Sequence, residues 1–202
     1  MAEQPISSNT NTATKPTPSE SPFGQKKNAP SYTKRKRASA ASEYKKSLVE
    51  KQTLKHWYGL SERQFKKYVK NTLAKMGKVD DVSNELIRVL EKRLDNVIFR
   101  IGFAKTRAQA RQLVSHGFFN VNGRRVNIPS YQVDRGDVVS LRGTKTKKGI
   151  FKDLDEQMKN REVPSWLSYE KAKLEAVCKG EPTLLEVKPP AEISLIFEFY
   201  SK

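Results

Sequence analysis

The pattern of apolar residues changes at Gly117, and this change constrains the fold more than any other feature of the chain. Before Gly117, apolar residues recur at the three- and four-residue spacing of amphipathic helices. After it, short apolar runs are separated by turn residues. Asn122-Gly123 divides residues 118–121 from residues 124–128, which predicts a β-hairpin with a two-residue type I′ turn. Helices followed by antiparallel strands predict an α+β fold.

A helix over residues 62–76 has the best-marked start in the sequence. Ser61 and Gln64 form a capping box, and Gly77 follows as a stop. One side of this helix is apolar and is expected to pack. The opposite side carries a row of cations at helical spacing: Arg63, Lys66, Lys67 and Lys70.

Three more helices are expected before Gly117. The first starts near Ser42, ends at Gly59, and should bury a face made of Tyr44, Leu48, Trp57 and Tyr58. The second runs without interruption over residues 83–101. The third covers residues 106–116, is opened by the capping box Thr106–Gln109, and should pack through Ala108, Leu113 and Val114. Beyond the hairpin, the patterns predict strands over 138–141, 166–169 and 174–177, a helix over 150–161, and a packed apolar segment over 193–200.

The charge of the chain indicates an anionic partner. The 202 residues include 39 Lys and Arg against 22 Asp and Glu, a net charge of +17, and residues 26–75 alone carry +12. Such a body repels itself unless a polyanion neutralises it. No segment approaches the ~20 apolar residues that span a bilayer, and no signal peptide is expected. Nucleic acid is therefore favoured over a membrane surface.

The sequence predicts neither a catalytic nor a metal site. Cys178 is the only cysteine, so no disulfide framework or multi-cysteine zinc site can form. His56 and His116 both lie in basic helices, and neither is coupled by a pattern to a nucleophile and an orienting carboxylate. We expect no enzyme activity and no cofactor.

Residues 1–25 are polar and of low complexity, so they are expected to be disordered. The basic run Lys34-Arg35-Lys36-Arg37 that follows suits a phosphate-contacting arm better than a nuclear signal, although both interpretations remain open.

A helix with spaced arginines next to an Asn-Gly hairpin is suited to the backbone of structured RNA. Guanidinium groups match phosphate oxygens in a bidentate manner, and duplex RNA is recognised largely by shape and phosphate. The predicted RNA-binding residues are Lys34, Arg35, Arg37, Lys51, Lys55, Arg63, Lys66, Lys67, Lys70, Arg93, Thr106, Arg107, Arg111, Gln112, His116, Asn122, Gly123, Arg124, Arg125 and Arg142.

Several segments resemble the RNA-binding domain named after ribosomal protein S-four. They are Arg93-Leu94-Asp95-Asn96-Val97, Arg100-Ile101-Gly102-Phe103, Thr106-Arg107, Ala110-Arg111-Gln112-Leu113-Val114-Ser115-His116 and Val121-Asn122-Gly123. That domain also occurs in RNA-modifying enzymes and tRNA synthetases. Flanking segments are similar to the ribosomal family itself: Glu50-Lys51-Gln52, Tyr58-Gly59-Leu60, residues 62–65, residues 127–133 and the C-terminal 198–202.

The resemblance implies a division of the chain into an N-terminal arm (1–41), a helical domain (42–91) closed by the tail (190–202), and an inserted RNA-binding domain (92–189) with two helices packed on a small antiparallel sheet. It implies a structural constituent of the small ribosomal subunit in the cytoplasm. The implied roles are primary binding to the 5′ region of small-subunit rRNA, organisation of assembly, and an influence on decoding accuracy. The implied partners are small-subunit rRNA, ribosomal protein S-five and mRNA at the channel through which it enters the ribosome, without self-association into a homo-oligomer.

The N-terminus departs from the family, because residues 1–22 are low-complexity and no cysteine precedes Cys178 to bind zinc. Two other classes of function are alternatives to a ribosomal protein. A stand-alone RNA chaperone or ribosome-rescue factor would not require residues 42–91 or the apolar tail. A membrane-surface module fits less well, because the apolar side of residues 62–76 is suited to protein packing.

Overall fold

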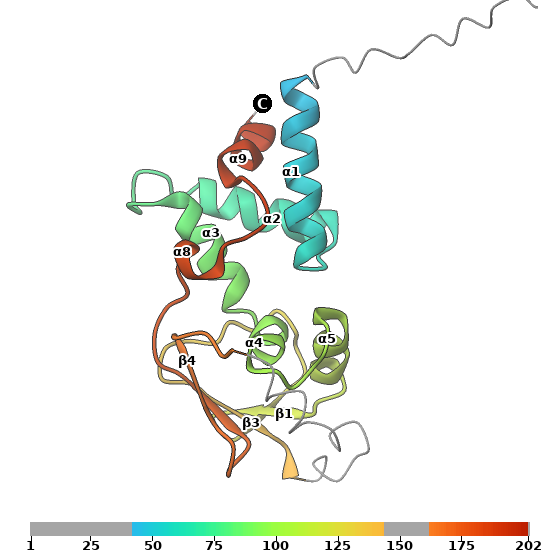
Figure 1. Ribbon diagram of the computed structural model, residues 1–202, viewed down its shortest axis with the longest axis vertical. Coiled ribbons are helices and arrows are strands. Elements are labelled where there is room, and N and C mark those ends of the chain that lie inside the picture. Colours follow the sequence, from blue (N-terminus) through green and yellow to red (C-terminus); the bar gives the residue numbers. More distant parts are fainter. Residues whose placement is uncertain (1–41, 144–161, 202) are drawn as a thin grey trace, which may run out of the picture. The chain divides into compact units, whose positions relative to one another are not determined.

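The computed structural model describes residues 42–143 and 162–201. The helices are α1 (Glu43–Trp57), α2 (Glu62–Leu73), α3 (Val82–Glu91), α4 (Leu94–Ile101), α5 (Arg107–Ser115), α8 (Leu184–Val187) and α9 (Ile193–Ser201) (Figure 1). The strands are β1 (Phe119–Val121), β2 (Arg124–Val126), β3 (Val138–Leu141), β4 (Leu167–Glu170) and β5 (Glu175–Cys178). The predicted α+β class is confirmed. The expected helix over 150–161 and the expected disorder of 1–25 concern residues outside the described ranges.

Two clusters of buried apolar side chains organise these elements. One lies among α1, α2, α3, α8 and α9, and its members include Leu54, Phe65, Leu86, Leu90 and Ile196. The other lies among α4, α5 and the strands, and its members include Leu94, Ile98, Leu113, Phe119 and Val139. The C-terminal helix α9 packs along α1 although more than a hundred residues separate them in the sequence (Figure 1). The expected packing of residues 193–200 is thus confirmed.

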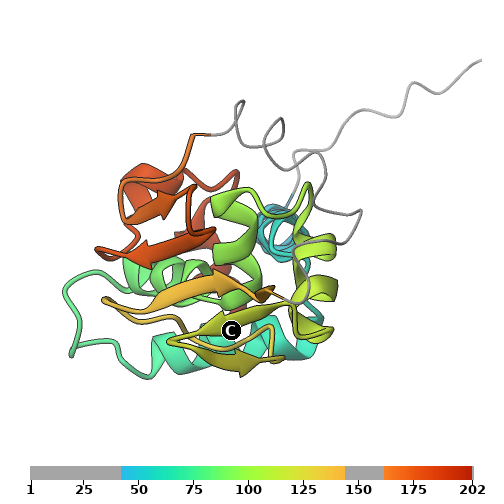
Figure 2. The same cartoon turned by 90° about the horizontal axis from the view of Figure 1, so that it is seen from below.

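The strands form one antiparallel sheet in the order β2-β1-β3-β5-β4 (Figure 2). At the β1–β2 turn, Asn122 and Gly123 both have positive φ (48° and 76°), the conformation that a type I′ turn requires. The side-chain oxygen of Asn122 accepts from the Val138 N–H at 2.9 Å, and its amide donates to Asp137 at 2.8 Å. The predicted hairpin is confirmed, and Asn122 also ties it to β3.

Both predicted N-caps are present at the helix starts, but the hydrogen bonds of the described residues do not include the reciprocal bond of a capping box, from the N–H of the cap residue to the Gln side chain. The Ser61 hydroxyl oxygen accepts from the Gln64 N–H at 3.3 Å. The Thr106 hydroxyl oxygen accepts from the Gln109 N–H at 3.1 Å, and the Gln109 side chain accepts from the Lys105 N–H. On α5, Leu113 and Val114 are buried as expected, but Ala110 rather than Ala108 completes the packed side.

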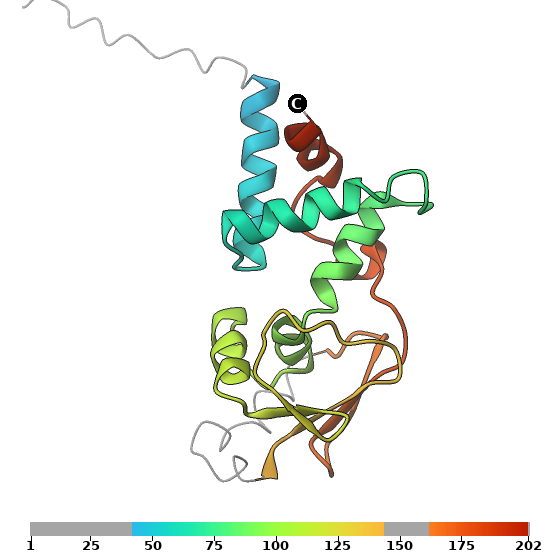
Figure 3. The ribbon, with the colours of Figure 1, turned by 180° about the vertical axis from the view of Figure 1, so that it is seen from behind.

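The prediction of one continuous helix over 83–101 is wrong. The chain leaves helical geometry at Arg93 (φ −63°, ψ 135°), between α3 and α4 (Figure 3). The first turn of α4 has no side-chain cap; its Leu94 and Asp95 N–H groups donate to the carbonyls of Tyr131 (2.8 Å) and Pro129 (3.1 Å). Apolar periodicity continues across the break because both helices bury one side, yet α3 and α4 bury those sides in different clusters.

The expected buried face of α1 is also wrong in part. Tyr44 is 60% exposed, and the most buried side chains of α1 are Ser47, Lys51 and Leu54. A buried lysine is compatible with this position because Lys51 Nζ pairs with Glu62 at 2.8 Å and lies 4.6 Å from the centre of the Phe199 ring. Polar contacts that the sequence pattern does not reveal therefore decide which side of α1 is covered.

Glu62, at the start of α2, joins this helix to α1 and α9 through hydrogen bonds. Its carboxylate accepts hydrogen bonds from Lys51, Lys55 and Tyr200. Burial raises the pKa of Glu62, but these hydrogen bonds outweigh burial and lower the pKa to about 2. A carboxyl group with a lowered folded-state pKa stabilises the fold above its unfolded-state pKa and loses that contribution as the pH falls.

We expect the free energy of unfolding to fall between about pH 4.5 and pH 2, in part through Glu62. In the Glu62→Gln variant, urea denaturation at a series of pH values should show lower stability at pH 7 and a flatter acid limb over this window. An acid limb identical to that of the wild type would contradict this role of Glu62.

Candidate nucleic-acid interface

The outer side of α2 presents the cation row that the sequence predicts. Phe65, Val69 and Thr72 are buried on the inner side. Arg63, Lys66, Lys67 and Lys70 are all exposed, and they form no ion pair within the part of the chain that the structure describes. The nearby carboxylate of Glu62 is already occupied by Lys51 and Lys55. The row is therefore uncompensated charge on a helix whose opposite side is fixed by packing.

The tip of the β1–β2 hairpin carries a second group of exposed cations, Arg124 and Arg125. The Arg125 guanidinium lies across the backbone of Gly117, where a Cβ would meet Arg125 Nε. Gly117 also has a φ of +67°, which strains any residue with a side chain at this position. Gln112 and His116, near the end of α5, are exposed. Arg142 is half-buried, and its N–H donates to the Phe118 carbonyl.

Other predicted RNA-binding residues are used inside the protein. Lys51 and Lys55 pair with Glu62, the Thr106 hydroxyl caps α5, and the Asn122 side chain binds Asp137 and Val138. Lys34, Arg35 and Arg37 lie outside the described residues.

Arg93 does not belong to an exposed surface, because it is 2% exposed. Its guanidinium donates two hydrogen bonds to Asp95, at 3.0 and 2.8 Å, and one to the Tyr68 hydroxyl at 2.6 Å. Burial lowers the pKa of Arg93, but the hydrogen bonds and charge of Asp95 outweigh burial and raise it. The Arg93 side chain is thus inside the protein and not on the exposed surface that the sequence predicted for it, and its RNA contact stays a prediction.

Arg111 connects α5 to the end of α1 rather than extending into solvent. Its Nε donates to Asp95 at 2.9 Å, and its two terminal nitrogens donate to the carbonyls of Tyr58 and Gly59. Since Asp95 also holds Arg93, one buried carboxylate serves two arginines from different elements.

Arg107 lies between aromatic rings. Its guanidinium carbon is 4.2 Å from the centre of the Trp57 ring and 4.4 Å from that of Phe99, and its Nε donates to the Asn96 side chain at 2.8 Å. Its Nη2 is buried with no hydrogen-bond partner among the described residues. Burial lowers the pKa of Arg107, although the charge of Glu91 acts in the opposite direction. Both predicted α5 arginines thus face the junction between the two apolar clusters.

Glu91 is the other buried acid of this junction. It is fully buried and accepts from the Tyr58 hydroxyl at 2.9 Å, from the Asn96 amide, and from Arg100 at 2.9 and 2.7 Å. We call the set formed by Tyr58, Glu91, Arg93, Asp95, Asn96, Arg100, Arg107 and Arg111 the junction network. Sequence reasoning treated Asp95 and Asn96 as parts of a motif, did not single out Glu91, and missed this role of all three residues. The sequence did contain a signal for these buried contacts. Glu91, Asp95 and Asn96 are polar, yet helical periodicity places them on the buried side, where polar side chains need partners.

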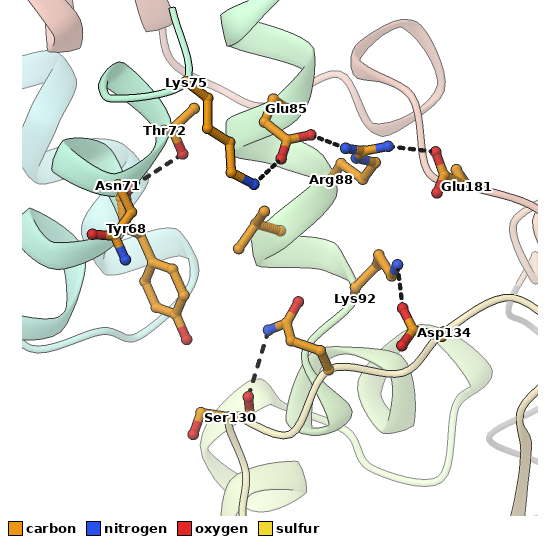
Figure 4. A pocket seen from close by; sticks show the side chains of 12 residues that line it. Tyr68, Asn71, Thr72, Lys75, Glu85, Arg88, Lys92, Ser130, Asp134 and Glu181 are labelled. Atoms are coloured by element: carbon orange, nitrogen blue, oxygen red, sulfur yellow. Dashed lines mark hydrogen bonds and ion pairs between the residues drawn. The ribbon is translucent and has the colours of Figure 1, made fainter. Parts of the chain in front are cut away.

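A groove runs between α2, α3 and the loop 127–134. Its larger part, a cavity of about 520 Å³, is lined by Tyr68, Asn71 and Thr72 of α2, by residues of α3 and by Ser130 and Gln132 (Figure 4). The charged residues of this part neutralise one another, because Lys75 pairs with Glu85, Arg88 with Glu85 and Glu181, and Lys92 with Asp134. A smaller hollow of about 210 Å³ adjoins it and is lined by Gln64, Lys67, Tyr68, Asn71 and Ser130.

Among the described residues, no cluster of His, Cys, Asp and Glu could hold a metal ion, and no helix has the length and apolar character needed to cross a membrane. Cys178 is buried, and burial raises the pKa of its thiol.

The junction network predicts the effect of replacing Arg111. We expect Arg111→Ala to lower the free energy of unfolding by about 1.5–3 kcal/mol, the typical value of hydrogen bonds to a charged group, because Asp95 and two carbonyls lose their partner. The salt dependence of RNA binding should stay unchanged. Urea denaturation and binding titrations measure the two quantities. A native-like stability together with a reduced salt dependence would show instead that Arg111 contacts phosphate.

Two family models match the chain. Residues 92–139 match the family model described as "S4 domain", and residues 8–91 match "Ribosomal protein S4/S9 N-terminal domain". A protein of Persephonella marina is 44% identical over 161 residues, which cover 79% of this chain and 77% of the relative. A protein of Herpetosiphon aurantiacus is 45% identical over 163 residues, covering 80% and 76% of the two chains. A protein of Chlorobium limicola is 41% identical over 174 residues, covering 86% and 84%.

All three relatives are named small ribosomal subunit protein uS4, and none is named as an enzyme. The alignments extend over about four-fifths of both sequences. The resemblance seen in the sequence is confirmed, and the chain belongs to the uS4 family of ribosomal proteins.

Proposed function

We propose that this chain is a structural constituent of the small ribosomal subunit and binds small-subunit rRNA through the outer side of α2 and the tip of the β1–β2 hairpin. Two observations support this proposal. The chain belongs to the uS4 family, and the exposed row Arg63, Lys66, Lys67 and Lys70 forms no ion pair among the described residues. Cations on a rigid helix are suited to phosphates, which supply most of the affinity for nucleic acid.

The junction network has a supporting part in this proposal. It links α1, α3, α4 and α5 through buried hydrogen bonds, so it limits how far the α2 row and the hairpin can shift. We infer that the cluster around α1–α3 and α9 is the helical domain (42–91 with 190–202). The cluster around α4, α5 and the sheet is the RNA-binding domain (92–189). Preorganised contacts bind more tightly because less conformational freedom is lost on binding.

The finer role that we propose is primary binding to the 5′ region of small-subunit rRNA, which organises assembly in the cytoplasm. Within the finished subunit, the chain would lie beside ribosomal protein S-five at the channel through which mRNA enters, and would influence decoding accuracy. It would act as one copy per subunit rather than as a homo-oligomer. The support for these roles is membership of the family together with the charge distribution.

Sedimentation of cell extract in a sucrose gradient, with immunodetection of the chain, tests the proposal. We expect the chain to travel with small subunits and, after purification, to prefer the 5′ fragment of small-subunit rRNA to large-subunit rRNA of equal length. Sedimentation with large subunits carrying stalled peptides would contradict the proposal and favour a ribosome-rescue factor.

A further inference from the structure

The small hollow beside α2 has the chemistry of a site for a single planar group. Gln64 and Asn71 contribute amides, Ser130 a hydroxyl, Tyr68 an aromatic ring and Lys67 a cation. Its volume of about 210 Å³ is below the roughly 300 Å³ at which pockets for drug-sized ligands begin, so it suits one ring system rather than an extended ligand.

The walls of the hollow are held in place. The Tyr68 hydroxyl accepts from Arg93 at 2.6 Å, and the buried Arg93 is fixed in turn by Asp95. On the other side, Ser130 lies in a loop whose neighbours Pro129 and Tyr131 accept hydrogen bonds from the first turn of α4. Figure 4 shows the Tyr68 and Asn71 side chains on α2 and Ser130 on the facing loop, three residues that line both the larger cavity and the small hollow. Asn71 is exposed and has no hydrogen-bond partner among the described residues.

The hollow lies at the cationic end of the groove. Lys67 lines the hollow and also belongs to the row Arg63, Lys66, Lys67 and Lys70. An RNA backbone whose phosphates contact this row therefore lies next to the opening of the hollow. The larger cavity next to it is neutralised by its own ion pairs and offers no such attraction. The loop also exposes apolar surface close by, since Ile128 is 56% and Tyr131 36% exposed.

We propose that this hollow binds one unpaired nucleobase of the RNA whose phosphates lie on the α2 row. The amides of Asn71 and Gln64 meet the edge of the base, while Tyr68 provides an apolar face and Lys67 holds the adjoining phosphate. Bases of unpaired nucleotides are recognised in this way, by aromatic contact and by hydrogen bonds to their edges, whereas paired bases of an RNA duplex are inaccessible in its deep major groove. The site rests on the proposed function and adds to it a preference for an unpaired nucleotide beside a helix.

The test uses the full chain, the 5′ fragment of small-subunit rRNA, and the variant Asn71→Leu, which removes an exposed amide without changing charge. We expect the affinity to fall about three- to tenfold, the effect of one or two lost hydrogen bonds, with an unchanged dependence on salt. The matched control is Asn127→Leu. It also removes an exposed amide, but Asn127 lies in the loop that faces α2 and does not line the hollow, so this variant should bind as the wild type does.

Dimethyl sulfate probing of the same complexes gives a second readout that does not depend on affinity. A carbodiimide, which modifies uracil and guanine at the base-pairing edge, is used in parallel with dimethyl sulfate, which modifies adenine and cytosine there. With the wild type, at least one unpaired base should be protected at its base-pairing edge, and this protection should weaken with Asn71→Leu and persist with Asn127→Leu. Equal affinities for the two variants, or a wild-type complex without any such protection, would overturn the site. Failure of the wild type to bind the fragment at all would instead overturn the proposed function, so the two results can be told apart.

Discussion

Replacement of Arg63, Lys66, Lys67 and Lys70 by glutamine is expected to weaken binding to small-subunit rRNA by about 10³-fold at 0.1 M salt. Each phosphate contact adds about 0.7–0.9 to the slope of log affinity against log salt, which is a factor of about five to eight per contact at this concentration. All four side chains are exposed and none is held by an acid of the described residues, so the loss should be electrostatic rather than structural. Binding titrations over a series of salt concentrations measure both affinity and slope, and the slope should decrease by about three.

The matched control removes four positive charges from other elements. Lys171, Lys173, Lys179 and Lys188 are exposed around the β4–β5 hairpin and the end of α8, and their replacement by glutamine changes the net charge equally. This control should lose far less affinity. Equal losses in both variants would mean that net charge alone attracts the RNA, and that α2 is not a specific contact surface.

Glu91→Ala is expected to lower the free energy of unfolding by about 3–5 kcal/mol, the usual consequence of removing one partner from a buried ion pair. Glu91 is fully buried and bonded to Tyr58, Asn96 and Arg100, so its loss leaves the Arg100 charge without its counter-ion and the Tyr58 hydroxyl without its acceptor, while the Asn96 amide keeps only its bond to the carbonyl of residue 91. Urea denaturation followed by circular dichroism measures the change through the transition midpoint at constant slope.

The control for Glu91 is Glu170→Gln at the surface. Glu170 pairs with Lys173, both side chains are more than half exposed, and such pairs contribute about 0–1 kcal/mol. If Glu91→Ala unfolds at the same urea concentration as the Glu170 variant, the junction network does not hold the two apolar clusters together.

The sequence alone is sufficient to predict the elements whose formation depends only on neighbouring residues. The capping residues Ser61 and Thr106 mark helix starts because a hydroxyl satisfies an otherwise unpaired N–H, which involves only neighbouring residues. The Asn122-Gly123 turn is equally local, because it depends on which residues tolerate positive φ. The same applies to the exposed side of α2, where four cations at helical spacing have no apolar neighbour among them.

The break at Arg93 could not be predicted, because its cause lies forty residues away in the chain. The carbonyls of Pro129 and Tyr131 replace the helical hydrogen-bond partners of α4, and nothing in residues 83–101 encodes their position. Apolar periodicity reports that a residue is buried, but not in which cluster.

The intramolecular contacts of Arg93, Arg107 and Arg111 could not be predicted for a related reason. A guanidinium makes the same bidentate bonds to a carboxylate as to a phosphate. Spacing in the sequence cannot decide between them when the carboxylate, Asp95, comes from another helix than Arg111. The resemblance to the family is confirmed by the comparisons, and the structure places these residues at the junction between the two clusters.

Ultraviolet crosslinking of the full chain to small-subunit rRNA, with the crosslinked peptides identified by mass spectrometry, tests the account most directly. We predict that the crosslinks concentrate on α2, on Ser130 of the facing loop and on the β1–β2 hairpin tip, and that the Arg107 and Arg111 side chains of α5 are absent from them. Crosslinks that centre on Arg107 and Arg111, with α2 unmodified, would contradict it.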